Sequence, residues 1–192
     1  MSVYGVEGGE IHPDTQLARN SHYGKSKLMA ETELNKLQDD NFKVAIIRPP
    51  MIYGKGCKGN YPRLRNLVFK TPLFPNIDNQ RSMVYIDNLC QFIAHIMEEG
   101  KSGLFFPQNK DYVKTTELVK LIAEANGKKI KLTKLFNPFI KIMKNSTIEK
   151  VFGNLTYDKE MSVLEGKENN EINYNIVAFN ESIKMTEKRG EK

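Results

Sequence analysis

The sequence predicts a globular α/β fold, and three observations support this prediction. Hydrophobic residues make up 40% and charged residues 27% of the 192 residues, a balance typical of a folded domain. The length suits one domain of about 100 to 200 residues. Short apolar segments, typical of buried strands, alternate along the chain with longer segments of helical periodicity.

Each element is predicted from its own pattern. The first helix is predicted over residues 22–38, where Leu28, Leu34 and Leu37 recur between lysines and glutamates. A helix over 115–126 is followed by Gly127, and glycine is the residue that most often follows a helix C-terminus. In chain order we predict helix 22–38, strand 43–48, a helix near 62–70, strand 82–87, helix 88–99, a short strand at 103–107 and helix 115–126.

Three further features of the sequence lie outside this alternation: an N-terminal segment, an apolar segment and the two cysteines. Residues 6–20 are predicted to be a loop, because no apolar strand precedes the glycines there and no helix pattern opens from them. The apolar segment from Leu135 to Met143 is predicted to be a helix that packs into the core. Cys90, in an apolar helical pattern, is expected to be a small buried hydrophobe. Neither Cys90 nor Cys57 has the spacing of a metal or disulfide motif.

Tyr23 and Lys27 form the most informative pair in the sequence. Residues four apart on a helix share one face, so the ammonium group can lie close to the phenol. A nearby positive charge favours the phenolate form of a tyrosine, which can then exchange a proton with a substrate hydroxyl. The same spacing also occurs on ordinary surface helices, and this alternative stays open when the pair is taken alone.

Context comes from five sequence blocks in a fixed order. They are Met1–Gly5, Tyr23–Lys27, Phe42–Gly54, Arg81–Asn88, and Phe152–Asp158 with Tyr174–Glu187 behind it. Together they resemble the extended short-chain dehydrogenase/reductase family, specifically its NAD-dependent nucleotide-sugar epimerases and dehydratases. The resemblance spans nearly the whole chain.

This resemblance implies the C-terminal part of a Rossmann-type doubly wound parallel sheet plus a small mixed α/β substrate-binding region. The chain would then be a single partial domain over residues 1–192. Residues 1–100 would supply mostly sheet strands, their helices and the active-site helix, while the substrate-binding region would be interleaved at about 54–80 and 103–192.

The family binds its dinucleotide through a glycine-rich turn that opens a helix, and this sequence contains no such motif. Because Val3–Gly5 corresponds to the end of a strand in the middle of the family's sheet, we expect the chain to be the C-terminal portion of a longer enzyme. The family's catalytic serine or threonine would fall one residue before Met1, so Ser2 is not assigned that role.

The resemblance also implies which residues form the site. Tyr23 and Lys27 are the expected catalytic residues and are also expected to contact the cofactor, NAD. Pro50, in the turn after an apolar strand, is expected to touch the nicotinamide. Asn60 and Arg81 are expected to bind the diphosphate of the substrate, and a guanidinium can pair bidentately with phosphate oxygens. No metal ligand is expected.

Epimerisation is the expected reaction. The family's 4,6-dehydratases carry Asp-Glu immediately before Val-Tyr-Gly, where this chain has Met1 and Ser2, so dehydration is disfavoured. The block from Arg81 to Asn88 looks most like the 4-epimerases, which favours an activity similar to UDP-glucose 4-epimerase. A nucleotide-sugar 4-keto reductase of the same family and a non-catalytic nucleotide-sugar-binding remnant stay open as alternatives.

The expected partner is therefore a nucleotide-diphosphate sugar, with a UDP-sugar favoured. A homodimer or association with the missing N-terminal half is the other partnership considered. The net charge is +6, but the lysines are spread over the chain, so no nucleic-acid partner is expected. No apolar run approaches the ~20 residues of a membrane span, so no membrane partner is expected and a cytoplasmic location is predicted.

Overall fold

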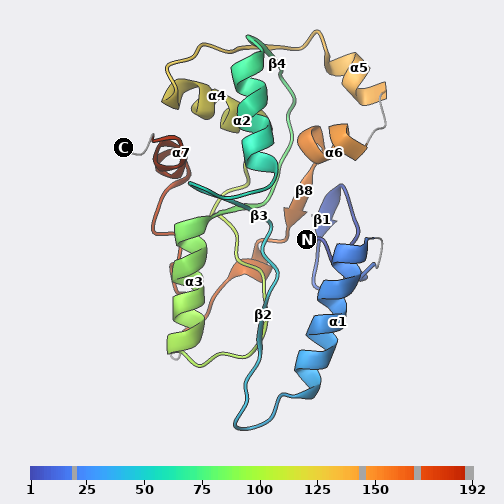
Figure 1. The fold of residues 1–192 in the computed structure, drawn as a ribbon, viewed down its shortest axis with the longest axis vertical. Helices are drawn as coiled ribbons and strands as arrows, with labels where there is room; N and C mark the ends of the chain where they lie inside the picture. Colours follow the sequence, from blue (N-terminus) through green and yellow to red (C-terminus); the bar gives the residue numbers. More distant parts are fainter. Residues whose placement is uncertain (19–20, 143–145, 167–169, 189–192) are drawn as a thin grey trace.

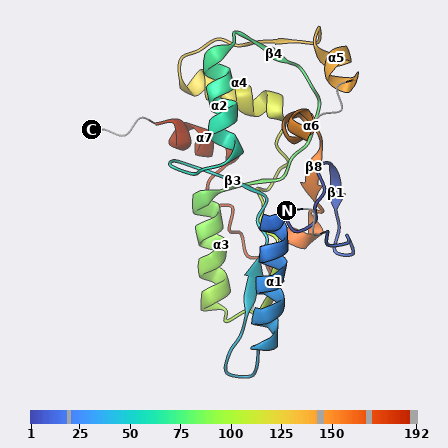
Figure 2. The same cartoon turned by 45° about the vertical axis from the view of Figure 1, so that its right-hand side comes forward.

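The computed structural model describes residues 1–18, 21–142, 146–166 and 170–188. Figure 1 shows an elongated molecule in which α1 and α3 flank β2 in one half, while α2, α4 and α7 gather in the other, and Figure 2 shows the same division. The elements in chain order are β1 (Gly9–Ile11), α1 (His22–Lys36), β2 (Ala45–Ile47), β3 (Met51–Tyr53), α2 (Asn60–Lys70), β4 (Leu73–Pro75), β5 (Met83–Tyr85), α3 (Ile86–Glu98), β6 (Gly103–Phe105), α4 (Thr115–Ala125), β7 (Lys131–Thr133), α5 (Asn137–Ile142), α6 (Ser146–Phe152), β8 (Leu155–Tyr157), the 3-10 helix η1 (Glu160–Ser162) and α7 (Phe179–Glu187).

The strands pair in parallel wherever the structure describes a ladder, which agrees with the predicted fold class. The pairs are β1 with β8, β2 with β6, β3 with β5, and β4 with β7. The chain changes partner at Pro49 and Pro50, since β2 pairs on one side of this turn and β3 on the other. Proline has no backbone N–H to donate to a ladder, so two successive prolines favour the end of one strand and the start of the next.

The predicted elements between residues 22 and 126 are all present, with ends that differ by no more than two residues. Gly127 ends α4 as predicted. It adopts a φ of 64°, and its N–H donates to Glu124 O at 3.0 Å while the Lys128 N–H donates to Ala123 O at 2.9 Å. A left-handed residue of this kind closes the helix by satisfying its last carbonyls.

Two predictions for the N-terminal segment were wrong. The predicted loop over residues 6–20 contains β1, which pairs with β8. Residues 19–20, the end of that predicted loop, lie outside the described part of the chain. The predicted strand end at Val3–Gly5 is instead a turn, in which Val3 and Tyr4 are buried. A strand of three residues that pairs with a segment about 145 positions away leaves no local periodicity to detect.

Two predictions of burial were also wrong. A helix is present in the Leu135–Met143 segment, but Phe139 is 69% and Ile142 is 79% exposed, so its outer face does not pack into the core; Met143 lies outside the described residues. Cys90 is exposed because the buried face of α3 contains Leu89, Phe92 and Ile96. Both errors have one cause, since an apolar pattern does not specify which face meets a partner.

Buried side chains form three clusters. The largest includes Tyr53 and Phe74 and joins α2, α4 and α7 to β3, β4 and β5. A second, which includes Tyr4, Leu28 and Tyr157, holds the N-terminal turn and α1 against β1 and β8. The third packs α3 against the segment that precedes α7. The second cluster therefore fixes the position of α1 relative to the strands.

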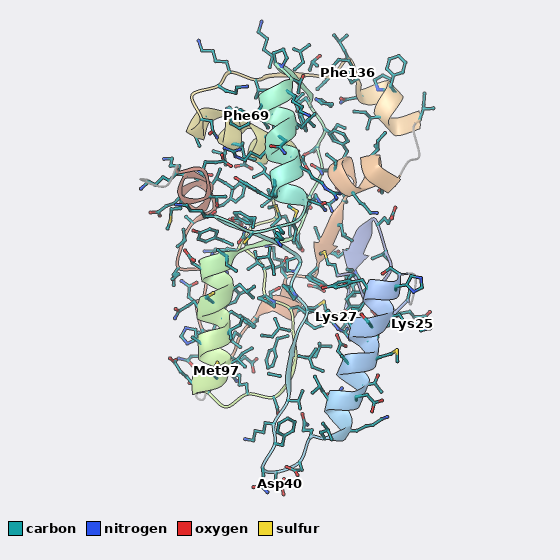
Figure 3. The ribbon with its side chains drawn as sticks, in the orientation of Figure 1. Lys25, Lys27, Asp40, Phe69, Met97 and Phe136 are labelled. Carbon is teal, nitrogen blue, oxygen red and sulfur yellow. The ribbon has the colours of Figure 1, made fainter. Side chains whose placement is uncertain are left out.

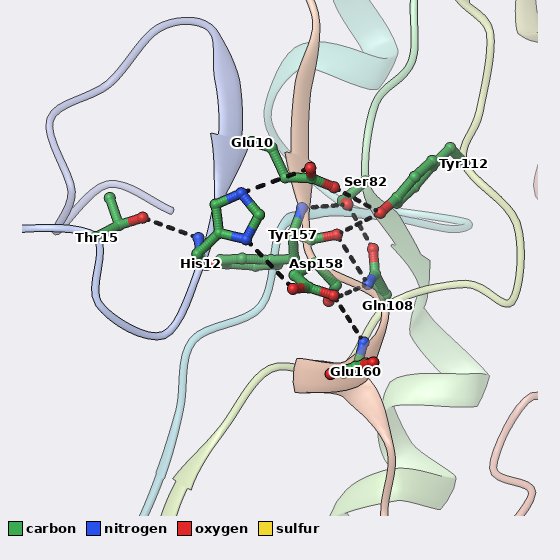
Figure 4. Close-up of polar contacts among 9 residues, drawn as sticks. All are labelled: Glu10, His12, Thr15, Ser82, Gln108, Tyr112, Tyr157, Asp158 and Glu160. Carbon is green, nitrogen blue, oxygen red and sulfur yellow. Dashed lines mark hydrogen bonds and ion pairs between the residues drawn. The ribbon is translucent and has the colours of Figure 1, made fainter.

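A polar cluster reinforces the β1–β8 pairing (Figure 4). His12 Nδ1 lies 3.2 Å from Asp158 Oδ2, and the Tyr112 hydroxyl donates to Glu10 Oε1 at 3.1 Å. The Glu160 backbone N–H donates to Asp158 Oδ1 at 3.0 Å. This backbone hydrogen bond, followed by that to His12, lowers the pKa of Asp158 below its ordinary value. Side chains thus hold the segment around β1 in place in addition to the short ladder.

Candidate functional site

A cavity of about 710 Å³ lies where the N-terminal turn, α1, the two-proline turn and the start of α2 meet. Its lining includes Tyr23, Lys27, Pro50, Asn60 and Arg81. The tertiary structure therefore brings together all five residues that the sequence predicted for the site. Their individual roles stay predictions.

The start of α1 is held by two local features. The Ser21 hydroxyl caps the helix by accepting a hydrogen bond from the Gly24 N–H at 3.0 Å, which satisfies a backbone donor of the first turn. A β-carbon added at Gly24 would lie 2.5 Å from the carbonyl oxygen of Ser2. Only glycine allows the helix to approach the N-terminal turn this closely, and this approach sets the position of Tyr23 at the cavity.

Tyr23 and Lys27 lie on the accessible surface of the cavity. Tyr23 is 63% exposed, and Lys27 Nζ lies 5.4 Å from the centre of its ring. Figure 3 shows Lys27 on the side of α1 that faces the strands and Lys25 on the opposite side. The two side chains therefore lie beside each other at the cavity, as their spacing on one helical face predicted.

An ion pair fixes α1 against the end of β2. Arg48 donates from Nη2 to Glu31 Oε2 at 2.5 Å and from Nε to Glu31 Oε1 at 3.1 Å, and its Nη1 donates to the Tyr4 hydroxyl at 3.0 Å. The Arg48 and Glu31 side chains are only 9% and 17% exposed. This two-point contact, which no sequence pattern indicated, holds α1 next to the two-proline turn.

Arg81 presents a partly buried cation to the same cavity. Its Nη1 donates to the carbonyl oxygens of Gly153 at 2.9 Å and Glu149 at 3.4 Å. Burial lowers the pKa of the guanidinium, and the Glu149 carboxylate offsets part of that effect. Both hydrogen bonds to described residues are to neutral carbonyls, so the positive charge of Arg81 suits an anionic ligand.

Two further lysines line the cavity and were missed by sequence reasoning. Lys58 lies in the loop before α2, and Lys150 lies on α6, where its Nζ is 3.3 Å from Glu7 Oε1. Together with Lys27, Arg48 and Arg81 they give the lining five cationic side chains against two carboxylates. No local motif marks either lysine as a cavity residue. Lys150 reaches the cavity only because the fold brings α6 there.

A second cavity of about 240 Å³ adjoins the first and shares Met51, Asn60, Arg81 and Lys150 with it. Its remaining wall is largely apolar and includes Leu64 and Leu118. A ligand that spans both cavities would therefore place its negative charge at Arg81 and an apolar or planar group in the smaller one. In the described part of the chain, no group of three or more histidine, cysteine or acidic residues could hold a metal ion.

Comparison with known proteins gives the following relatives. A UDP-glucose 4-epimerase of Vibrio cholerae is 36% identical over 117 residues, which are 58% of this chain and 36% of that protein. Among solved structures, the UDP-glucuronic acid 4-epimerase of Bacillus cereus in complex with NAD has a TM-score of 0.66 at 16% identity, covering 97% of this chain and 57% of that one. The UDP-N-acetylglucosamine 4-epimerase of Bacillus cereus has a TM-score of 0.61 at 18% identity, with 97% and 58% covered.

These structural matches confirm the predicted Rossmann-type α/β fold, and at such low identity they show the fold alone. The chain spans 36% of the length of the curated relative and somewhat under 60% of the two solved structures. No helix within the described ranges is long and apolar enough to cross a membrane.

The sequence profile described as the NAD dependent epimerase/dehydratase family matches residues 1–112, which is more than half of the chain. This description, and the NAD complex among the structural matches, agree with the cofactor expected from the sequence. The match also confirms the resemblance carried by the first four sequence blocks. The chain therefore belongs to the NAD-dependent epimerase/dehydratase family.

Proposed function

We propose that this chain carries the proton-transfer and substrate-binding residues of an NAD-dependent nucleotide-sugar 4-epimerase that acts on a UDP-sugar. The observation that carries the proposal is the convergence of Tyr23, Lys27, Pro50, Asn60 and Arg81 on one cavity. The curated relative named UDP-glucose 4-epimerase supports the choice of reaction.

Each residue has a defined part in this proposal. Tyr23, as the phenolate, accepts the proton of a sugar hydroxyl and later returns it to the inverted carbon's oxygen. Lys27 would donate hydrogen bonds to the ribose hydroxyls of the cofactor. Pro50, which is buried, forms an apolar wall at the nicotinamide.

The residues present fit the nicotinamide end of NAD. Lys27 is an exposed donor beside Tyr23, and the buried Pro50 lines the same cavity. When bound, NAD supplies the acceptor and donor of the hydride. The residues of this chain orient the sugar, move its proton and exclude water at the apolar wall; binding of the cofactor's pyrophosphate is assigned to none of them.

The diphosphate of the substrate is assigned to the cationic end of the cavity. Arg81 and Asn60, with Lys150 added from the structure, line both cavities at their junction. The nucleoside would then occupy the smaller cavity against Leu64 and Leu118. This placement leaves the sugar in the larger cavity, which Tyr23 also lines.

Calorimetric titration of UDP-glucose into the purified chain tests substrate binding. We expect Arg81→Gln to weaken binding about 10- to 100-fold, since a hydrogen bond to a charged group contributes about 1.5 to 3 kcal/mol. Lys43→Gln, a charge change at an exposed position that does not line either cavity, serves as the control and should leave binding unchanged. Equal binding by wild type and Arg81→Gln would contradict the assignment of the diphosphate.

The reaction is tested by following interconversion of UDP-glucose and UDP-galactose with NAD present. Turnover that Tyr23→Phe abolishes, with no net change in the amount of NADH, supports the epimerase. Turnover with stoichiometric loss of a reduced dinucleotide would instead identify the keto reductase. Binding of the nucleotide sugar without any turnover would identify a binding protein that does not catalyse the reaction.

A further inference from the structure

The excess of positive over negative charge in this chain falls in one segment. Residues 125–148 contain six lysines and no aspartate or glutamate. The whole chain has 29 basic and 23 acidic residues, so the other 168 residues contain 23 of each and are formally neutral. The lysines counted as spread over the chain therefore include a cluster that accounts for the entire net charge of +6.

Large apolar side chains in the same segment face solvent. Leu135 is 79%, Phe139 69% and Ile142 79% exposed. The Ile140 N–H donates to Phe136 O at 3.0 Å, so the helical turn begins before α5. Because the three positions are spaced i, i+4 and i+7, their side chains share one face, which we call the apolar stripe. The apolar stripe therefore faces solvent, whereas the apolar face of an amphipathic helix usually packs against the protein core.

The stripe and its lysines lie at one end of the molecule. Figure 3 shows Phe136 at one extreme and Asp40 at the other, and Figure 1 shows α5 close to β4 at the same end as Phe136. Lys129, Lys131 and Lys134 are exposed and precede the stripe directly in the chain. A cavity beside α5 is lined by Lys134 and by two acidic residues, Glu149 and Asp78, of which Asp78 is paired with Lys114 at 2.7 Å.

We propose that this end of the molecule, from Lys128 to Ile142, docks on the surface of an anionic lipid bilayer. Exposed aromatic and aliphatic side chains flanked by lysines match the two components of such a surface, its acyl boundary and its negative headgroups. Peripheral binding needs both an apolar and a basic contribution, and this segment contains both. The proposal goes beyond the proposed reaction and is independent of it. It replaces the expectation of no membrane partner, which considered only spanning segments.

Charge and shape favour a bilayer over other occupants. A nucleic acid would engage the lysines but would leave Leu135 and Ile142 in water, since phosphates make no use of aliphatic side chains. A second copy of this chain would bring its own Lys129, Lys131 and Lys134 close to the first set, and like charges in contact oppose association. A bilayer accepts the apolar stripe and neutralises the lysines at the same time.

Vesicle flotation with the full chain tests this proposal. Vesicles of phosphatidylcholine with one quarter phosphatidylglycerol are compared with vesicles of phosphatidylcholine alone, each at 0.1 M and 0.5 M salt. We expect binding to the anionic vesicles, at least tenfold weaker binding to the neutral ones, and a marked loss at the higher salt concentration, where the Debye length is shorter.

Two double variants separate the two contributions. Phe139→Gln with Ile142→Gln should lower the partition coefficient at least about tenfold. Lys129→Gln with Lys131→Gln should lower it about 25-fold on anionic vesicles, at about fivefold for each lysine near the surface. Met97→Gln is the control, because Met97 is 74% exposed but lies on α3 in the other half of the molecule, and it should change binding less than twofold.

The opposite results would overturn the proposal. These are failure of the wild-type chain to float with anionic vesicles, or unchanged flotation of the Phe139→Gln, Ile142→Gln variant. Sedimentation velocity without lipid addresses the other occupant: a wild-type dimer that this variant converts to a monomer would assign the stripe to self-association and refute bilayer docking. All substitutions are at exposed positions, and circular dichroism confirms that each variant is folded.

Discussion

Glu31→Gln tests the ion pair that holds α1 beside the two-proline turn. In the wild-type chain, both oxygens of this carboxylate accept from Arg48, whose side chain is 9% exposed. Burial acts to lower the pKa of Arg48, but the hydrogen bonds that Arg48 donates to Glu31 and Tyr4 outweigh it and raise the pKa above its ordinary value. The substitution keeps the size of the side chain and removes its charge, leaving the guanidinium without a carboxylate partner.

The expected cost follows from the burial of the pair. Removing one partner of a fully buried ion pair costs about 3 to 5 kcal/mol, because the other charge is left uncompensated. Glu31 is 17% exposed, and the glutamine amide still offers one acceptor oxygen, so we expect about 2 to 3 kcal/mol. For a chain of this length, about 2 to 4 °C is lost for each kcal/mol, which gives a decrease in Tm of about 4 to 12 °C.

Urea unfolding and thermal melts followed by circular dichroism measure this effect. Glu33→Gln is the matched control, because Glu33 lies on the same helix and pairs with Lys36, but its side chain is 69% exposed. An exposed pair of this kind contributes less than about 0.5 kcal/mol. If Glu31→Gln and Glu33→Gln unfold at the same urea concentration, the buried pair does not stabilise α1 and the reasoning is wrong.

Three further predictions concern stability. Gly24→Ala should destabilise the chain by about 2 kcal/mol in urea unfolding, because the added carbon would clash with Ser2 O, whereas an open helical site would gain about 0.5 to 1 kcal/mol. Glu187→Gln should lower the free energy of unfolding by about 2 to 3 kcal/mol, since this buried carboxylate accepts hydrogen bonds from a tyrosine, an arginine and an asparagine at 2.6 to 2.9 Å. Glu181→Gln, at an exposed position on the same helix, should lower it by less than about 0.5 kcal/mol. Asp158→Asn should destabilise the chain at pH 7, where the wild-type carboxylate is ionised. The difference should shrink as the pH falls below the ordinary aspartate pKa of about 4, because a lowered pKa stabilises the fold above the unfolded-state value and this contribution is lost on protonation. Melting curves across this range would contradict that reasoning if the difference grew on acidification.

The sequence by itself determined the features that depend on local rules. The spacing of Tyr23 and Lys27 places them on one helical face wherever that helix lies, and the periods of α1, α3 and α4 determine where these helices run. Gly127 ended α4 as predicted because a C-cap is a local conformation. The ordered blocks were sufficient to predict the family and its fold.

Only the tertiary structure decided which distant residues meet. It brought Arg81 and Lys150 to the cavity that α1 also lines, and only the first of these was predicted, from its place in a family block. It paired β1 with β8, and it turned the stripe of α5 towards solvent. Periodicity shows that a face is apolar, but whether that face is buried depends on what the rest of the chain packs against it. That outcome is a property of the whole fold, so no local pattern contains it.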